Sequence, residues 1–503
     1  MRDAVRETIR RHRSAHRPAA VAATVGVAAA MGAILLSGPW DAGQREAERA
    51  RAAVVADAPT GSRDTGTAGD RSGGSRPGEK PPVAAPSAGP VLEPLGPRVI
   101  DFFPGAEPTP ADRDRGIAGN PAPVDPASVL DPLLDDPALG PDPAASVIDL
   151  TDGRPLYTRN GDRSMAPAST VKAATAAAAL HTLGPDHRLT TRVVLDPDRE
   201  RVILVGGGDT GLGHRELGRL AARTAEALRE RGIDAVGVGW DAGPDGAPSH
   251  HPIGVNHNIA PFTPLMVNGG RLDDSTTGPA PRSADPAADA AGAFVRLLKG
   301  EGVEVRGSSA APRPVPGKAE EVAVHRSVPL AVLVEEMLTD SDNDMAESLA
   351  RAVGEARGHG AGLTGATRGV TEALTDIGLP MDGVRVADGS GLDRSGRMTT
   401  DALVGLLALA ADPGRPELRT VLTGLPVAGF TGTLDSRYPD VGAGVVRAKT
   451  GTLTGVNALA GTVVDTEGRV LAFAFLTEGT VSATAAQDAL DRAAAALSRC
   501  GCG

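Results

Sequence analysis

Ser169 and Lys172 are the residues whose types and spacing first suggest chemistry in this sequence. A serine hydroxyl is a poor nucleophile until an adjacent base takes its proton. Ser169-Thr170-Val171-Lys172 opens an Ala-rich stretch, 170–183, for which we predict a helix. Residues i and i+3 share a helical face, so the lysine amine can reach the hydroxyl, and the helix N-terminus favours developing negative charge. The same four residues also fit a helix-capping serine followed by a surface lysine.

Two later segments carry groups that would complete such a site. Ser341-Asp342-Asn343 lies between two predicted helices, so this loop can point a hydroxyl and an amide into a cleft. Lys449-Thr450-Gly451-Thr452 ends a Val-rich strand and offers a cation and two hydroxyls to a carboxylate, with a glycine where a substrate backbone could approach. Each segment alone fits a helix cap or a strand-end turn. All three in this order favour an active site.

The use of lysine supports this interpretation. The chain has 51 basic residues, of which only five are lysines, and two of these lie in the three motifs. Arginine keeps its charge at accessible pH, whereas a lysine can lose its proton. Lys172 and Lys449 are therefore candidates for roles that arginine cannot perform.

The elements that must position these residues begin near residue 126. A hairpin is expected at 146–150 and 155–159, around Asp152-Gly153. Further strands are expected at 201–205, 234–239, 445–449, 458–464 and 470–476, and further helices at 215–231, 287–299, 329–338, 343–356, 364–377 and 482–497. Strands at both ends of this unit predict one sheet whose first and last strands pair.

The first quarter of the chain has a different character. Residues 1–17 are rich in arginine and precede an uncharged run, 18–39, which is long enough to cross a bilayer. We expect a transmembrane anchor with a cytoplasmic basic tail, which places residues 40–503 outside the cytoplasm. A cleaved signal peptide and a soluble helix are the alternatives. Residues 40–125, rich in Pro, Gly and Ser, are expected to form a disordered linker.

Composition argues against several other functions. The net charge of −12 argues against a nucleic-acid partner. Cys500 and Cys502, separated by one residue, would close a strained ring, so we expect neither a disulfide nor a zinc site. His250, His251 and His257 lie in a Pro/Ser/Asn-rich stretch without helical spacing, where we expect a solvated loop and no metal.

A glycine-rich segment suggests one rival function. Residues 206–211 satisfy the G-x-G-x-x-G pattern of dinucleotide-binding loops. The predicted helix does not begin until about residue 215, and the preceding strand is not the first of a βαβ unit. We therefore expect a tight turn rather than a nucleotide site.

Together the three motifs resemble the active-site set of class A β-lactamases and penicillin-binding proteins. The chain is most similar to the D-alanyl-D-alanine carboxypeptidase/endopeptidase family, which comprises the class C low-molecular-mass penicillin-binding proteins of peptidase family S13. The stretches that agree are 167–172, 183–186, 204–209 and Asp388-Gly389-Ser390-Gly391-Leu392. The resemblance spans roughly 126–498. The family usually has a serine where Asp393 stands here, and residues 242–258 do not match the family's Trp/Tyr-containing substrate pocket.

The resemblance implies an α/β (α+β) fold, a penicillin-binding/β-lactamase-like transpeptidase domain with an antiparallel sheet flanked by helices. This catalytic domain would span 126–503. The 172 residues from Ser169 to Ser341 exceed what a single helical subdomain needs, so a domain inserted at about 203–325 is expected.

The resemblance also implies a serine-type hydrolase that needs no cofactor and cleaves peptidoglycan stem peptides. Ser169 would attack the carbonyl of the penultimate D-alanine with Lys172 as base, while Ser341 relays the proton and Asn343 holds the substrate amide. The expected site is catalytic Ser169, Lys172, Ser341, Asn343 and Lys449, substrate-binding Thr450, Gly451, Thr452 and Arg394, and an oxyanion hole formed by the N–H groups of Ser169 and Thr452. The expected partners are stem peptides, β-lactam antibiotics and, through the N-terminal segment, a membrane.

Two alternatives use the same residues. A β-lactamase or esterase would turn the acyl-enzyme over rapidly, but no Glu-x-x-Leu-Asn deacylation segment lies between Asn343 and Lys449. A non-catalytic penicillin-binding sensor would not need the intact serine and both lysines.

Overall fold

The computed structural model of the chain describes residues 124–241, 249–438 and 441–502. The predicted basic tail, the 18–39 anchor and all but the end of the 40–125 linker lie outside the described residues. In the described part, no helix combines the length and the apolar character that a membrane crossing requires.

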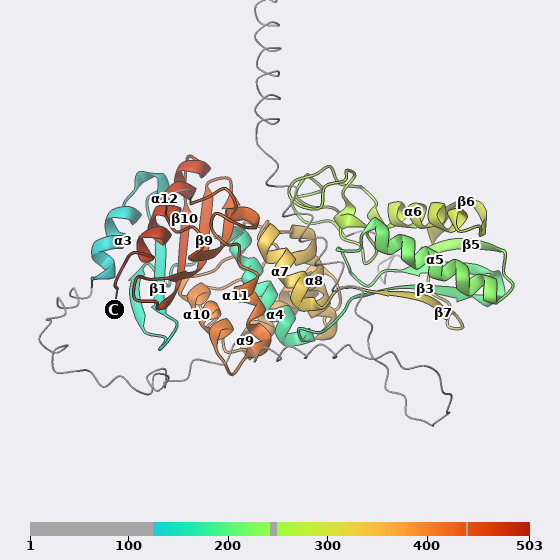
Figure 1. Cartoon of the computed structure of the whole chain (residues 1–503), viewed down its shortest axis with the longest axis horizontal. Coiled ribbons are helices and arrows are strands. Elements are labelled where there is room, and N and C mark those ends of the chain that lie inside the picture. The colour runs from blue at the N-terminus through green and yellow to red at the C-terminus, as the bar shows by residue number, and fades with distance from the viewer. Residues whose placement is uncertain (1–123, 242–248, 439–440, 503) are drawn as a thin grey trace, which may run out of the picture. The chain divides into compact units, whose positions relative to one another are not determined.

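The first sheet brings the two ends of the described chain together. Its five strands are all antiparallel, in the order β2-β1-β10-β9-β8. β1 (Ala144–Asp149) forms the predicted hairpin with β2 (Pro155–Arg159), and its other edge pairs with β10 (Val470–Glu478). The predicted pairing of first and last strands is therefore confirmed. β9 (Val456–Val464) and β8 (Val446–Leu453) complete the sheet (Figure 1).

Helices cover both faces of this sheet, because its strands carry apolar side chains on both faces. On one face Phe473 and Phe475 pack with α3 (Pro126–Leu134) and α12 (Ala483–Leu497). On the other face Ala472 and Ala474 join a core shared by α4 (Lys172–Leu183), α7 (Leu330–Asp340), α8 (Asn343–Ala356), α9 (Leu363–Asp376) and α10 (Thr400–Ala411). The expected antiparallel sheet flanked by helices is thus confirmed.

The Ala-rich helix α4 is the centre of this second helical layer. Every residue from Lys172 to Leu180 is buried. Small alanine side chains let the neighbouring helices approach α4 from all sides, and α8, α9 and α7 all contact it. The helix that begins beside Ser169 is therefore enclosed in the core, which fixes the position of its first turn.

A second five-stranded sheet, in the order β6-β5-β4-β3-β7, is built between the first and second motifs. Its strands are β3 (Thr190–Asp196), β4 (Arg201–Val205), β5 (Ala235–Asp241), β6 (Glu304–Pro312) and β7 (Glu320–Arg326). β4, β5 and β6 run parallel, and helices α5 (His214–Glu230) and α6 (Pro286–Gly300) pack against the sheet with their own apolar core (Figure 1). The sheet begins at Thr190, earlier than the 203–325 range expected for an insertion. The domain boundaries themselves stay a prediction.

The glycine-rich segment after β4 forms the expected tight turn. A side chain at Gly207 would place its Cβ 2.2 Å from the carbonyl oxygen of Thr190, and Gly208 has a φ of +81°. The glycines are therefore required by the close approach of this chain's own backbone.

Short helical turns connect these elements. They are η3 (Pro137–Leu139), η4 (Ala168–Val171), η5 (Pro197–Arg199), η6 (Asn268–Gly270), η7 (Pro416–Leu418), α11 (Thr420–Thr423) and η8 (Gly432–Leu434).

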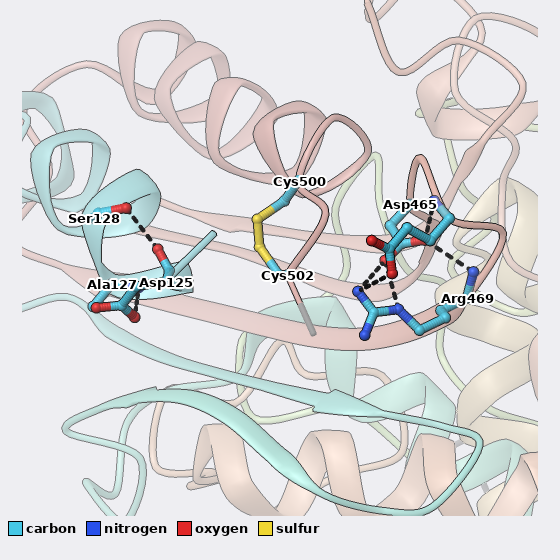
Figure 2. The surroundings of a disulfide bond; sticks show 8 residues. Asp125, Ala127, Ser128, Asp465, Arg469, Cys500 and Cys502 are labelled. Carbon is cyan, nitrogen blue, oxygen red and sulfur yellow. Dashed lines mark hydrogen bonds and ion pairs between the residues drawn. A yellow bond between two sulfur atoms is a disulfide. The ribbon is translucent and has the colours of Figure 1, made fainter. Parts of the chain in front are cut away.

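The C-terminal cysteines correct one expectation. Cys500 and Cys502 are joined by a disulfide directly after α12, as Figure 2 shows. Their Cα atoms are 4.9 Å apart, within the range that a disulfide spans, so the single intervening residue does not prevent the bond. The expectation of a prohibitively strained ring was wrong.

Candidate active site

Ser169 lies in η4, the short helical turn that leads into α4. The predicted helix over 170–183 is thus regular only from Lys172, and a tighter turn carries the serine. Ala168 has a positive φ of 46°, and the Thr170 hydroxyl donates to the Pro167 carbonyl at 2.7 Å. These features turn the chain sharply before Ser169, and η4 packs against β8 and β9. The serine is thereby held between the start of α4 and the edge strand β8.

The Lys172 amine is fully buried and lies within reach of three oxygens. Its Nζ donates to Asn343 Oδ1 and to the Ser390 carbonyl, both at 2.7 Å, and lies 3.0 Å from Ser169 Oγ. A neutral amine has two N–H donors and one lone pair. Because two acceptors use the two N–H groups, the lone pair is left facing the serine hydroxyl, which is the geometry of a general base.

Burial makes that neutral form accessible. Desolvation lowers the pKa of Lys172 to about 8, although the carboxylates of Asp388 and Asp342 favour its charged form and oppose this effect. Burial also lowers the pKa of Lys449 well below its ordinary value, and repulsion from Lys172 adds to that effect. A substrate carboxylate beside Lys449 would favour its charged form again.

The second motif is held by the junction of two helices. Ser341 ends α7 with a left-handed φ of 58°, and the Asp342 carboxylate caps α8 by accepting the N–H of Met345 at 2.8 Å. Asn343 is therefore the first residue of α8. Lys449 Nζ donates to Ser341 Oγ at 2.9 Å, which links the second motif to the third.

Six of the nine predicted site residues border a cleft of about 890 Å³, whereas Lys172, Lys449 and Gly451 are buried behind its lining. Ser169, Ser341, Asn343, Thr450, Thr452 and Arg394 all line it. Arg394 is exposed and donates to the Thr454 carbonyl at 2.9 Å. A second cavity of similar volume lies beside α3 and α12, but none of the sequence-predicted site residues lines it.

Gly451 has a structural role besides the substrate contact expected of it. A Cβ at this position would lie 2.8 Å from the Pro167 carbonyl oxygen and 3.1 Å from the Ala168 Cβ. The glycine thus allows β8 to approach the residues just before Ser169. The neighbour that excludes a side chain here is this chain's own backbone.

The stretch from Asp388 to Leu392 forms the floor beneath Lys172. Gly389 and Gly391 are needed because a Cβ at Gly389 would lie 2.5 Å from the Ala346 carbonyl oxygen, and one at Gly391 would clash with the Ala168 carbonyl. Gly391 also has a φ of +84°. The loop therefore packs against both α8 and the backbone before Ser169, and it brings the Ser390 carbonyl to the Lys172 amine.

Comparison with known proteins agrees with this geometry. The sequence matches the model of the D-Ala-D-Ala carboxypeptidase 3 (S13) family over residues 127–281 and 273–499. The chain belongs to this family. It is 38% identical to carboxypeptidase DacB of Mycolicibacterium smegmatis over 421 residues, which covers 79% of this chain and 90% of that protein. It is 32% identical to a D-alanyl-D-alanine carboxypeptidase of Actinomadura, covering 70% of this chain and 80% of the relative.

The fold of this S13 chain is also that of a solved penicillin-binding protein. The crystal structure of penicillin binding protein 4 from Haemophilus influenzae superposes with a TM-score of 0.61 at 21% identity. The match covers 72% of this chain and 97% of that structure. The chain is thus a serine-type peptidase, a hydrolase, with a penicillin-binding fold.

Sequence reasoning did not predict that three buried residues meet beside the S13 site. His251, Glu347 and Asp388 place one potential ligand atom each within 4.8 Å of the others. His251 had been expected in a solvated loop, but its side chain is 3% exposed and its Nε2 lies 3.0 Å from Asp388 Oδ2. That expectation was wrong because the segment after residue 248 packs against α8. Neither a motif nor a periodicity marks His251 in the sequence.

Hydrogen bonds already occupy most of this group. Asp388 accepts from the backbone N–H groups of Gly391 and Asp393 as well as from His251, and Glu347 Oε1 accepts from Gly389 and Ser390. Of these carboxylate oxygens, only Glu347 Oε2 has no hydrogen-bond partner in the described part of the chain. We therefore describe the three side chains as a hydrogen-bonded network that supports the loop under Lys172.

Proposed function

We propose that this S13 peptidase removes the terminal D-alanine from peptidoglycan stem peptides through an acyl-enzyme on Ser169, and that β-lactams acylate the same serine. The single observation that carries the proposal is the buried Lys172 amine, whose Nζ lies 3.0 Å from Ser169 Oγ and 2.7 Å from each of two other acceptors, Asn343 Oδ1 and the Ser390 carbonyl. The curated relatives, which are carboxypeptidases by name, support the substrate class.

The first half of the reaction forms the acyl-enzyme. Neutral Lys172 takes the Ser169 proton as Oγ bonds to the carbonyl carbon of the penultimate D-alanine. The tetrahedral intermediate then collapses, and the bond from this carbon to the nitrogen of the terminal D-alanine breaks. Ser341, hydrogen-bonded to Lys449, relays to the leaving amine the proton that Lys172 took, so that Ser341 keeps its hydroxyl and Lys172 is neutral again. The N–H groups of Ser169 and Thr452 would stabilise the oxyanion, as the family resemblance implies.

The substrate carboxylate would bind beside Lys449. The Thr450 hydroxyl is within hydrogen-bond distance of the Thr433 hydroxyl, at 2.9 Å, and Gln487 donates to Thr452 Oγ1 at 3.0 Å. These contacts orient both hydroxyls before a ligand arrives. The cation and the two oriented hydroxyls therefore suit a terminal carboxylate, which both a D-Ala-D-Ala peptide and penicillin possess.

Water completes the reaction by hydrolysing the acyl ester. A β-lactam would leave its ring-opened body attached at the serine, and the missing deacylation glutamate predicts slow release. Penicillin binding protein 4 of Haemophilus influenzae has been solved in complex with a β-lactam. The absence of that glutamate segment supports a penicillin-sensitive peptidase over a β-lactamase.

We also propose that residues 18–39 anchor the chain and that residues 40–503 act outside the cytoplasm, where the substrate lies. The uncharged run and the preceding arginines support this location. The N-terminal sequence of protein recovered from a membrane fraction tests it. A mature terminus after residue 39 would replace the anchor by a cleaved signal.

Intact-mass spectrometry with penicillin tests the proposed function. The wild-type protein should gain the mass of one penicillin, with the adduct on the peptide that contains Ser169, and should release D-alanine from a D-Ala-D-Ala peptide. Ser169→Ala should do neither while keeping its unfolding midpoint. Rapid penicillin hydrolysis without an adduct would assign the chain to the β-lactamase alternative, and an adduct on another residue would refute the assigned nucleophile.

A further inference from the structure

His251 is a buried histidine that the mechanism above does not use. It belongs to the described part of the connection between β5 and α6, residues 249–285. The backbone N–H of Ile253 donates to Nδ1 at 3.3 Å, so Nδ1 presents a lone pair and Nε2 carries the ring proton. His251 Nε2–H therefore donates to Asp388 Oδ2 at 3.0 Å.

The Asp388 carboxylate in turn fixes one peptide group under Lys172. Its Oδ1 accepts the N–H of Gly391 at 2.8 Å. That N–H belongs to the same planar peptide unit as the Ser390 carbonyl, which accepts from Lys172 Nζ at 2.7 Å. A rotation of this peptide plane would therefore move the carbonyl away from the amine.

The connection between β5 and α6, which contains His251, also holds Asn343, the other residue that accepts a hydrogen bond from Lys172. Asn343 Nδ2 donates to the Asn258 carbonyl at 2.9 Å while its Oδ1 accepts from Lys172. The Ala260 N–H donates to Asp344 Oδ1 at 2.8 Å, and the Arg282 guanidinium pairs with Asp344 at 2.9 Å. Both oxygens that orient the lysine amine are thus tied to residues 249–285.

We propose that His251 is a positioning residue for acylation: by holding Asp388, it orients the Ser390–Gly391 peptide so that the Lys172 lone pair faces Ser169. The inference rests on the proposed function, because it takes Lys172 as the base. His251 contacts no reacting atom, and its effect passes through Asp388 and one peptide plane.

The experiment must separate the hydrogen bond from packing, because the His251 side chain is almost completely enclosed. His251→Leu keeps a similar volume and removes the donor. His251→Gln keeps an N–H donor that can reach the position of Nε2. His251→Asn is polar but too short to reach Asp388. His250→Leu is the matched control, because His250 is exposed and does not line the cleft.

The measurement is the rate of penicillin acylation at increasing penicillin concentration, together with the unfolding midpoint of each variant. A lost positioning contact should lower the limiting acylation rate of His251→Leu about tenfold or more and leave the half-saturating concentration unchanged. His251→Asn should be equally slow. The limiting acylation rate of His251→Gln should lie within about threefold of the wild-type rate, because glutamine restores the hydrogen bond to Asp388. His250→Leu should match wild type.

Two results would overturn the inference. One is a folded His251→Leu or His251→Asn variant that acylates at the wild-type limiting rate. The other is a His251→Gln variant as slow as His251→Asn at the same unfolding midpoint, which would assign the effect to packing. If His251→Leu does not fold, the comparison of Asn with Gln decides the question. A wild-type protein that penicillin does not acylate at all would instead refute the proposed function.

Discussion

Lys172 and Asn343 are 171 residues apart in the sequence, yet Lys172 Nζ donates to Asn343 Oδ1 at 2.7 Å. The contact joins the first turn of α4 to the first residue of α8, two helices that pack together in the core. It uses one of the two N–H groups of a neutral amine, and the Ser390 carbonyl uses the other. The remaining lone pair is available to Ser169, so the proposed base is oriented by groups that do not react.

Exchanging each lysine for arginine should distinguish the base from the cation. Lys172→Arg keeps a charge but cannot release a proton, so acylation by penicillin should fall by about a thousandfold or more. Lys449→Arg keeps a cation for the substrate carboxylate and should retain a measurable share of activity. Stopped-flow acylation measures both rates, and circular dichroism verifies that both variants fold. Near-native acylation by Lys172→Arg would mean that another group deprotonates Ser169.

The acylation rate should rise with pH. Burial lowers the pKa of Lys172 to about 8, and the reactive form is the neutral amine. Below that pKa the neutral fraction grows about tenfold per pH unit, and above it the rate should level off. A profile recorded from about pH 6 to about pH 10 shows this limb. The Lys449→Arg variant removes the other buried amine and leaves Lys172 in place. Because the rise reports the titration of Lys172, this variant should show the same rise. Disappearance of the rise in that variant would assign the titration to Lys449.

Ser341→Gly should separate activity from stability. Ser341 has a φ of 58°, where glycine is favoured by about 1 kcal/mol, and this gain offsets roughly 1 kcal/mol for the lost hydrogen bond to Lys449. The free energy of unfolding should therefore change by less than about 1 kcal/mol, whereas acylation should fall about a hundredfold without the hydroxyl. Ser341→Ala is the comparison, equally slow but about 1 kcal/mol less stable than the glycine variant. Chemical denaturation and acylation rates test both, and wild-type acylation by Ser341→Gly would remove Ser341 from the mechanism.

Gly391→Ala should disrupt the site. Its Cβ would clash with the carbonyl of Ala168, the residue before Ser169, and the φ of +84° adds strain. We expect a loss of about 3 kcal/mol or more in the free energy of unfolding, and no penicillin adduct on any folded protein.

Gly153→Ala is the matched control for this substitution. Gly153 has a φ of +74° but no atom within 4 Å of the added Cβ. The control should lose only about 1 kcal/mol, from the conformation alone. Urea denaturation of both variants measures the difference. Equal losses would show that the contact between Gly391 and Ala168 relaxes without cost.

The local parts of the site were predictable because short-range geometry determines them. A serine and a lysine three residues apart on one helical turn must face the same side, whatever surrounds the helix. The β1–β2 hairpin could be inferred in the same way, whereas the pairing of the first and last strands was inferred from the presence of strands at both ends of the unit. Strands β3, β6 and β7 were missed. β6 and β7 pair with strands far away in the sequence, whereas β3 pairs with the neighbouring β4 and was missed although its partner is local.

The sequence by itself therefore indicated the candidate nucleophile and base, and it determined the family and the pairing of the first and last strands of the sheet. Only the tertiary structure decided what holds the base in place. His251, Glu347 and Asp388 meet because the connection between β5 and α6 packs against α8, and no spacing rule relates residues 251 and 388. The same holds for Gly391, whose identity is required by a carbonyl far away in the sequence. Such contacts depend on how whole elements pack, whereas a motif records only the geometry of neighbouring residues.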